Sequence, residues 1–174
     1  MALVSVPLVL LLGITSGRIS NSGYGNSWFD ALSKPSVMPP GWAFGVAWTA
    51  LYILLGLAIA IVITARDAPR WKAAVTFFLI QLLLNLAWSP LFFGAHQILA
   101  GLILILAILA IAAITTALFA RVRGSAALLM LPYLAWLIFA AYLNYQMLAL
   151  NPEADALALA GHNANIRAIM ANIC

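Results

Sequence analysis

Four long stretches of this chain carry no Asp, Glu, Lys or Arg at all. They are residues 1–17, 35–65, 73–120 and 124–152. About 20 apolar residues cross a bilayer as a helix, because each advances roughly 1.5 Å through a hydrocarbon core about 30 Å thick. Backbone amides left unpaired in lipid cost several kcal/mol each, so such stretches have to be helical. The pattern predicts an all-α, polytopic membrane protein.

The stretch 73–120 is too long for one span and breaks near 94–97, so we expect it to hold two helices. The chain then forms a single bundle of five transmembrane helices over residues 1–150. Their expected ranges are about 2–19, 41–65, 72–94, 97–121 and 125–150. Three connections are short, which makes neighbouring helices antiparallel. The exception is 18–40, which is long enough to act as a functional loop or lid.

The two ends of the chain allow more than one interpretation. Residues 2–17 could be a signal-peptide core, but no basic residue precedes them and no clear cleavage site follows, so a retained helix is favoured. The tail 151–174 is too polar for a sixth span. Its Ile166, Ile169, Met170 and Ile173 have helical spacing, which fits either a short interfacial helix or a frayed tail.

Composition agrees with a membrane protein, since 66% of residues are hydrophobic and 7% charged, against about 25% charged in soluble domains. The net charge of +4 does not indicate a nucleic-acid partner, because the basic residues stand singly or in pairs at span ends. Five basic residues share the end of the bundle opposite the 18–40 loop, which favours that end as cytoplasmic. We expect a multi-pass protein of a bacterial membrane, or of the mitochondrial outer membrane if the host is eukaryotic.

Conventional catalytic groups are missing from the spans. No charged residue lies within them and no internal repeat is visible, which argues against ion-coupled transport. His96, His162 and Cys174 are isolated in the sequence, and no spacing fits a nucleophile–base pair or a metal site. We therefore expect no metal, no cofactor and no firm catalytic residue.

Three spans instead place aromatic and amide side chains on one helical face each. These candidate ligand-binding residues are Phe44, Trp48 and Tyr52, then Gln81, Asn85 and Trp88, then Tyr133, Trp136, Ala140 and Asn144. Amides are costly toward lipid, so the faces should point inward. Counted from the loop, Trp48 lies about 12 Å deep and Trp136 about 21 Å. The other positions counted cluster near Trp48, which suggests an aromatic cavity beneath the loop.

Spacing alone leaves a second interpretation open, and slightly favours it. Asn and Gln on inward faces often only join helices by hydrogen bonds. Two Gly-x-x-x-Gly sets, Gly13/Gly17 and Gly41/Gly45, could also bring helices together. For each set, chance or packing within the chain is favoured over dimerisation.

The same residues resemble the signature of the TspO/MBR family, which comprises the tryptophan-rich sensory proteins and the translocator proteins. The first motif reads Trp28-Phe29-Asp30-Ala31-Leu32-x-Lys34-Pro35-Ser36-x-x-Pro39-Pro40-Gly41, followed by Ala47-Trp48-x-x-Leu51-Tyr52. The later motifs read Gln81-x-x-x-Asn85-x-x-Trp88-Ser89-Pro90-x-Phe92-Phe93, Pro132-Tyr133-x-x-Trp136 and Tyr142-Leu143-Asn144. They occur in the family's order over about residues 1–150, so the combined pattern is highly specific.

The resemblance implies five transmembrane helices, commonly in a homodimer, and a cavity under the first loop. That cavity is expected to bind porphyrins such as protoporphyrin IX, and sterols in some members. Trp48 and Trp136 match the family's cavity tryptophans, and Tyr52, Asn85, Trp88 and Asn144 match other cavity positions. Because these coincide with the faces found by spacing, the pocket becomes the favoured interpretation.

Two departures from the family pattern limit the carry-over. Family members commonly have an aromatic residue between the Lys-Pro and Pro-Pro pairs, whereas this chain has Val37 there. The rim of its pocket should therefore differ from that of other members. After Tyr142 and Tyr145 no basic residue follows until Arg167, so no cholesterol motif is predicted.

The leading functional expectation is a membrane receptor or sensor that binds porphyrins and regulates tetrapyrrole metabolism. The macrocycle would stack on Trp48 and Trp136, and its propionates would pair with Arg18 or Lys34 at the loop. The alternatives are light- and oxygen-dependent porphyrin degradation, with Trp48 and Trp136 as the reactive residues, and passive transport of tetrapyrroles or sterols. Expected partners are an apolar small molecule, membrane lipid and a second copy of the chain, but no nucleic acid.

Overall fold

The computed structural model describes residues 1–154 and 156, and these form a helical bundle. Its elements are α1 (Ala2–Ile19), α2 (Ser27–Ala31), α3 (Gly41–Ile63), α4 (Trp71–Ser89), the π-helix η1 (Pro90–Gly94), α5 (Ile98–Val122) and α6 (Gly124–Leu150). Five spans, with η1 continuing α4, are long and apolar enough to cross a membrane, which confirms the expected fold class. The tail helix expected around residues 166–173 lies outside the described residues.

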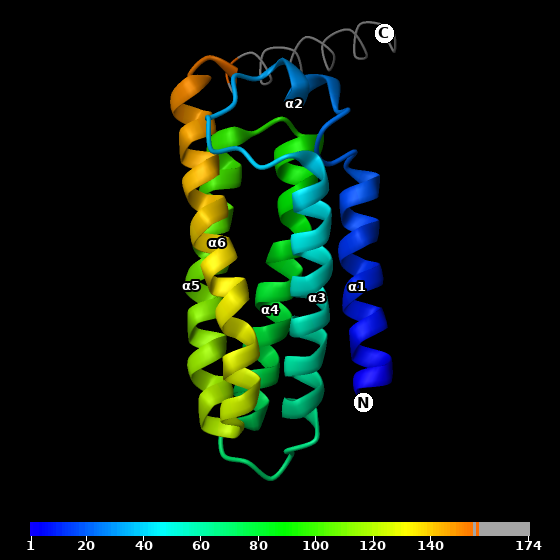
Figure 1. Cartoon of the computed structure of the whole chain (residues 1–174). Helices are drawn as coiled ribbons and strands as arrows, with labels where there is room; N and C mark the ends of the chain where they lie inside the picture. Colours follow the sequence, from blue (N-terminus) through cyan, green and yellow to red (C-terminus); the bar gives the residue numbers. More distant parts are fainter. Residues whose placement is uncertain (155, 157–174) are drawn as a thin grey trace, which may run out of the picture.

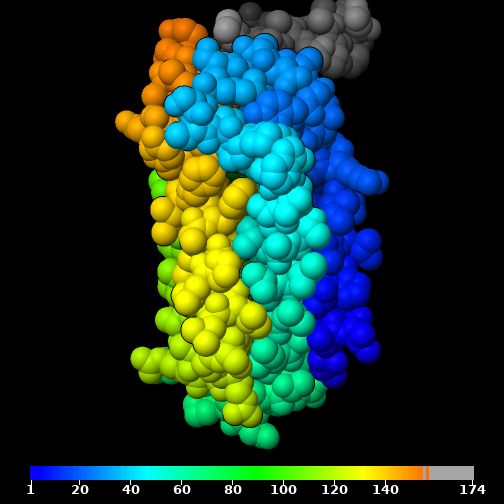
Figure 2. Space-filling view, viewed as in Figure 1, coloured from blue at the N-terminus to red at the C-terminus, as the bar shows by residue number. Residues whose placement is uncertain are grey.

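The four helices α3, α4, α5 and α6 surround the core, and α1 stands beside α3 at the edge of the bundle (Figure 1). The segment 20–40, with the short helix α2 inside it, crosses one end of the bundle next to the end of α6. We call this the loop end. In the space-filling view this segment covers the loop end from α3 across to α6 (Figure 2). Anything beneath it is therefore roofed by protein.

Pro90 explains why α4 passes into a π-turn. Proline has no backbone N–H, so it cannot donate to the carbonyl of Leu86 four residues earlier. The Ser16 hydroxyl of α1 donates to that carbonyl instead, at 2.6 Å. The chain continues with a wider turn, closed by the bond from the Ala95 N–H to the Pro90 carbonyl at 2.8 Å. Pro90 thus begins a local π-helix, and the Ser16 hydrogen bond ties α1 to α4.

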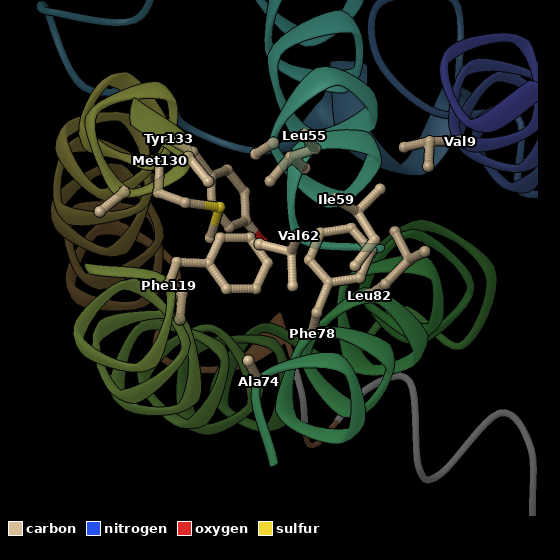
Figure 3. Close-up of a cluster of buried hydrophobic side chains, with 14 of the residues drawn as sticks. Val9, Leu55, Ile59, Val62, Ala74, Phe78, Leu82, Phe119, Met130 and Tyr133 are labelled. Carbon is tan, nitrogen blue, oxygen red and sulfur yellow. The ribbon is translucent and has the colours of Figure 1, made fainter. Parts of the chain in front are cut away.

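The half of the bundle away from the loop end is closely packed. Leu55, Val62, Phe78 and Phe119 are almost fully buried there, and the rings of Phe78 and Phe119 stack with centroids 5.8 Å apart. These side chains point from α3, α4 and α5 toward the bundle axis (Figure 3). Because this half is filled, any internal space has to lie in the half under the loop.

The 20–40 segment is held by specific hydrogen bonds. Asn26 caps α2 by accepting from the Phe29 N–H at 3.1 Å. The Lys34 ammonium donates to the carbonyls of Phe29, Asp30 and Leu32, at 2.8, 3.1 and 3.2 Å. Both ends of the short helix are therefore satisfied, and the segment forms an ordered roof over the loop end.

Candidate ligand-binding cavity

A cavity of about 420 Å³ lies under this roof, within the range of small-molecule sites. Every membrane-spanning helix contributes to its wall, and so does the 20–40 segment. Eight of the ten candidate residues line it: Phe44, Trp48, Tyr52, Asn85, Trp88, Trp136, Ala140 and Asn144. The residues picked out by helical spacing on α3, α4 and α6 thus face one common space.

The indoles of Trp48 and Trp136 meet across this space. Their ring centroids lie 6.3 Å apart with the planes at 79°, an edge-to-face contact. Trp48 also stacks on Tyr52 at 5.3 Å, and Phe44 meets Trp136 edge-on at 5.9 Å. Counting residues from the loop placed Trp136 deeper than Trp48, and the ring contact shows that the two indoles nevertheless reach each other.

Gln81 and Tyr133 are the two candidates that do not line the cavity. Both are fully buried, on α4 and α6, in the layer beneath the cavity floor. Helical spacing placed them on the correct inward face. However, the bundle at their level is filled by side chains such as Met130 and Leu82. An inward-facing side chain there packs into the core and does not line the cavity.

A hydrogen-bonded chain links two side chains of the cavity floor, Tyr52 and Asn85, to Tyr133 in the layer beneath it. The Tyr52 hydroxyl donates to the Asn85 amide oxygen at 3.1 Å, and the Asn85 amide nitrogen donates to the Tyr133 hydroxyl at 3.1 Å. The chain joins α3, α4 and α6 at one level. Asn85 therefore joins helices by hydrogen bonds and also lines the cavity.

Two other polar groups at the wall have no protein partner within the described chain. The Asn144 side chain is 3% exposed, and neither its amide nitrogen nor its oxygen makes a hydrogen bond there. The indole Nε1 of Trp136 is likewise shielded and unpaired. A buried polar group without a partner costs about 1–3 kcal/mol, so a ligand that reaches either group, after a shift of the side chains that cover it, recovers part of that cost.

The roof is aromatic. Phe29 of α2 lies edge-on to Phe93 at 5.3 Å, and Phe92 stacks on Trp88 at 4.9 Å. The expected pairing of a ligand carboxylate with Lys34 does not fit this arrangement, because three carbonyls already accept from its ammonium group. Arg18, exposed in the last turn of α1, remains as a basic residue close to the roof.

Helical spacing placed the cavity beneath the loop but did not identify the lining residues that α1, α2 and η1 contribute. Gly13 and Gly17 of α1 line the cavity, as do Phe29, Phe92 and Phe93. The two Gly-x-x-x-Gly sets were a usable signal for α1, since Gly13 lies so close to the Tyr52 ring that a Cβ there would overlap it. Phe92 and Phe93 belonged to the quoted motifs, but only the π-turn at Pro90 determines where they point.

Comparison with known proteins agrees with this architecture. The sequence model of the TspO/MBR family matches residues 5–150. The chain belongs to the TspO/MBR family. Its relatives include Tryptophan-rich protein TspO of Chlorobaculum tepidum, 45% identical over 128 residues, which is 72% of this chain and 81% of that protein. Translocator protein of Homo sapiens is 40% identical over 136 residues, 77% of this chain and 80% of its own length.

A third relative, Protein CrtK of Rhodobacter capsulatus, is 36% identical over 146 residues, or 83% of this chain and 89% of that protein. The resemblance drawn from the motifs is thus confirmed, and this TspO/MBR family member is an integral, multi-pass membrane protein. The departures seen in its sequence fall outside the cavity wall. Val37 is exposed on the roof, and Tyr142 and Tyr145 are exposed on the outer face of α6.

Proposed function

We propose that this protein binds porphyrins, such as protoporphyrin IX, in the cavity under residues 20–40, and acts as a sensor or regulator in tetrapyrrole metabolism. One observation carries the proposal. The wall combines the facing indoles of Trp48 and Trp136 with two shielded polar groups that lack protein partners, the Asn144 amide and the Trp136 Nε1. A flat, apolar molecule with a few polar atoms is the ligand class that satisfies both features.

The expected interactions follow from the wall. Indole and phenyl rings stabilise a conjugated macrocycle by about 0.5–1.5 kcal/mol per ring beyond burial. The Asn144 amide provides both a donor and an acceptor for a polar substituent. Carboxylates at the edge of the macrocycle would extend toward the roof and Arg18, since the Lys34 ammonium is already bound to carbonyls.

Titration of the purified protein with protoporphyrin IX, followed by the porphyrin Soret band, tests the proposal. We expect Trp48→Ala combined with Trp136→Ala to weaken binding roughly 5- to 150-fold, because two stacking contacts are lost. Trp42→Ala is the matched control, since the Trp42 indole is 72% exposed and lies outside the cavity wall. Equal affinity of the double variant and the control would reject the cavity as the porphyrin site.

Degradation of the bound porphyrin is a second candidate, and the contact series Trp136–Trp48–Tyr52 favours it. These rings are oxidisable and touch one another, so a light-excited porphyrin with dioxygen would have electron donors at contact distance. Illumination of the aerobic complex distinguishes the two functions. Loss of the Soret band faster than for free porphyrin, and slower again in Trp48→Phe, supports degradation, whereas loss at the free rate leaves binding alone.

A further inference from the structure

The exposed part of the cavity wall is confined to one side of the bundle. Every lining residue on α4, η1, α5 and α6 is buried or half-buried. The exposed lining residues all come from α1, from the 20–26 segment and from the start of α3: Ile14, Ser22, Tyr24, Gly41, Gly45 and Thr49. The cavity therefore reaches the protein surface at the seam between α1 and α3.

Close contacts frame this opening below and above. Below it, Gly13 of α1 packs directly against the Tyr52 ring of α3. Above it, the Tyr24 ring lies against Gly41, and the Tyr24 hydroxyl donates to the Pro39 carbonyl at 3.2 Å. Between them, α3 rises about 12 Å from Gly41 to Thr49. We call the opening bounded by these contacts the α1–α3 window.

The centre of the α1–α3 window holds no side chain. A Cβ placed on Gly45 would meet no heavy atom within 4 Å, and one placed on Gly17 would meet only Ser22, at 3.9 Å. The Thr49 hydroxyl donates to the Gly45 carbonyl at 2.8 Å. The Thr49 hydroxyl is thus already satisfied, and it offers no obstacle to an apolar molecule.

The window faces lipid hydrocarbon rather than water. Trp42, at the start of α3, is 72% exposed, as expected for a tryptophan in the interface region of a bilayer. Gly45 and Thr49 lie about 5 and 10 Å farther along the helix axis. The opening is therefore at the depth of the acyl chains.

In contrast to the window, the route through the 20–40 segment is closed by hydrogen bonds. The Ser33 N–H donates to the Asn151 amide oxygen and the Asn151 amide nitrogen donates to the Ser33 carbonyl, both at 2.9 Å, which joins the 20–40 segment to the end of α6. Asn151 also donates to the Met147 carbonyl at 2.7 Å. Entry through the roof would break these hydrogen bonds and separate Phe29 from Phe93. Among the described residues, by contrast, no hydrogen bond crosses the window between its lower contact at Gly13 and its upper contact at Tyr24.

We propose that the ligand enters and leaves the cavity laterally, from the hydrocarbon of the bilayer, through the α1–α3 window. This proposal rests on the proposed porphyrin binding and identifies the source of the ligand as the membrane phase. It also gives a role to the glycines at positions 17 and 45, which leave the seam open. The class of ligand that fits is a flat, apolar molecule that dissolves in the membrane.

A reversible block of the window tests the route. In a Cys174→Ser background, Gly45→Cys is reconstituted in liposomes and labelled with benzyl methanethiosulfonate, which dithiothreitol removes. Exchange of protoporphyrin IX between empty and protein-containing liposomes is followed by stopped-flow fluorescence. We expect the label to slow both association and dissociation roughly tenfold or more, and reduction to restore both rates.

Three further variants separate the possible outcomes. Thr49→Cys lies one turn farther along α3 and repeats the block at a second window position. It serves as the test if Gly45→Cys folds poorly. Gly94→Cys is the control, because a side chain there also meets open space but lies outside the cavity wall. Asn151→Leu removes the hydrogen bonds that join the roof to the end of α6, and lateral entry predicts little change in its exchange rates.

Unchanged rates in both labelled window variants, with faster exchange in Asn151→Leu, would overturn lateral entry in favour of the roof. Slowing of Gly94→Cys to the same extent would overturn it as well, since the effect would then not be local. Because the proposal rests on porphyrin binding, failure of the unmodified protein to bind protoporphyrin IX overturns both proposals. Normal binding with unaltered exchange overturns lateral entry alone.

Discussion

Two amide side chains on α4 show how much a buried polar residue depends on its partners. Gln81 and Asn85 lie one turn apart, are both buried and face the same way. Asn85 is hydrogen-bonded to Tyr52 and Tyr133, whereas neither polar atom of the Gln81 amide has a partner in the described part of the chain. Desolvation is therefore compensated at Asn85 and uncompensated at Gln81.

Replacing each amide by leucine should have opposite effects on stability. We expect Gln81→Leu to raise the free energy of unfolding by about 1 kcal/mol, because it removes an unpaired buried amide at similar volume. Asn85→Leu should lower it by about 1–3 kcal/mol, because two buried hydroxyls lose their partner. Unfolding titrations in mixed micelles measure both. A loss of stability in Gln81→Leu would show that its amide has a binding partner, such as an internal water.

Helical spacing predicted the directions of these residues but not their levels. The inward faces of Trp48 and Trp136 follow from periodicity alone. Their convergence on one cavity became the favoured prediction only with the family resemblance, since spacing by itself slightly favoured simple packing. Gln81 and Tyr133 fit the same pattern equally well, and yet they lie under the floor. The level of a residue along the bundle depends on helix length and on what fills the next layer, and neither is encoded in the spacing of one helix.

At the scale of elements, α1 depends on a few close contacts. It buries only Val9 and Gly13, so little side-chain packing holds it. Instead the Ser5 hydroxyl donates to the Gly56 carbonyl of α3 at 2.8 Å. A Cβ on Gly56 would lie 2.6 Å from the Cα of Val6, so the backbones of α1 and α3 approach one another at this point. In lipid, such close backbone contact is a main source of helix association.

Gly56→Ala should therefore displace α1. The added methyl group meets backbone, which cannot rotate away, so we expect a loss of about 1–3 kcal/mol in stability. Gly124→Ala is the control, because nothing lies within 4 Å of a Cβ at the start of α6. Thermal unfolding in detergent compares the two. A melting temperature of Gly56→Ala equal to that of the control would contradict the close packing of α1 on α3.

The sequence predicted the existence of the five spans but not the details of these elements. Charge-free stretches, with 73–120 divided at residues 94–97, predict five spans, because lipid admits only helices there. By contrast α1 is apolar all around, so no face of it could be assigned to a neighbour. The change from α4 to η1 at Pro90 also depends on Ser16, a residue of another helix, which local sequence cannot reveal.

At the scale of the whole molecule, the bundle consists of a packed half and a hollow half. The packed half, around Phe78 and Phe119, is filled by buried side chains of α3, α4, α5 and α6. The hollow half keeps aromatic rings beside an open space, which costs packing energy, and leaves the buried Asn144 amide without a partner among the described residues. Stability and ligand binding should therefore be separable. A larger side chain that fills the cavity should abolish ligand binding without lowering the stability of the fold.

Ala140→Phe is the variant that separates them, since Ala140 lines the cavity wall on α6. A ligand present at 100 times its dissociation constant stabilises the folded state by about 2.7 kcal/mol. We expect protoporphyrin IX to raise the melting temperature of the unmodified protein and to leave that of Ala140→Phe unchanged. Without ligand, the melting temperature of Ala140→Phe should equal or exceed that of the unmodified protein, because the ring gains contacts in the cavity.

Ala117→Phe, on an exposed position of α5, is the control and should keep the full ligand-induced rise in melting temperature. A full rise in Ala140→Phe would place the porphyrin elsewhere, and a low melting temperature without ligand would show that the hollow half also supports the fold.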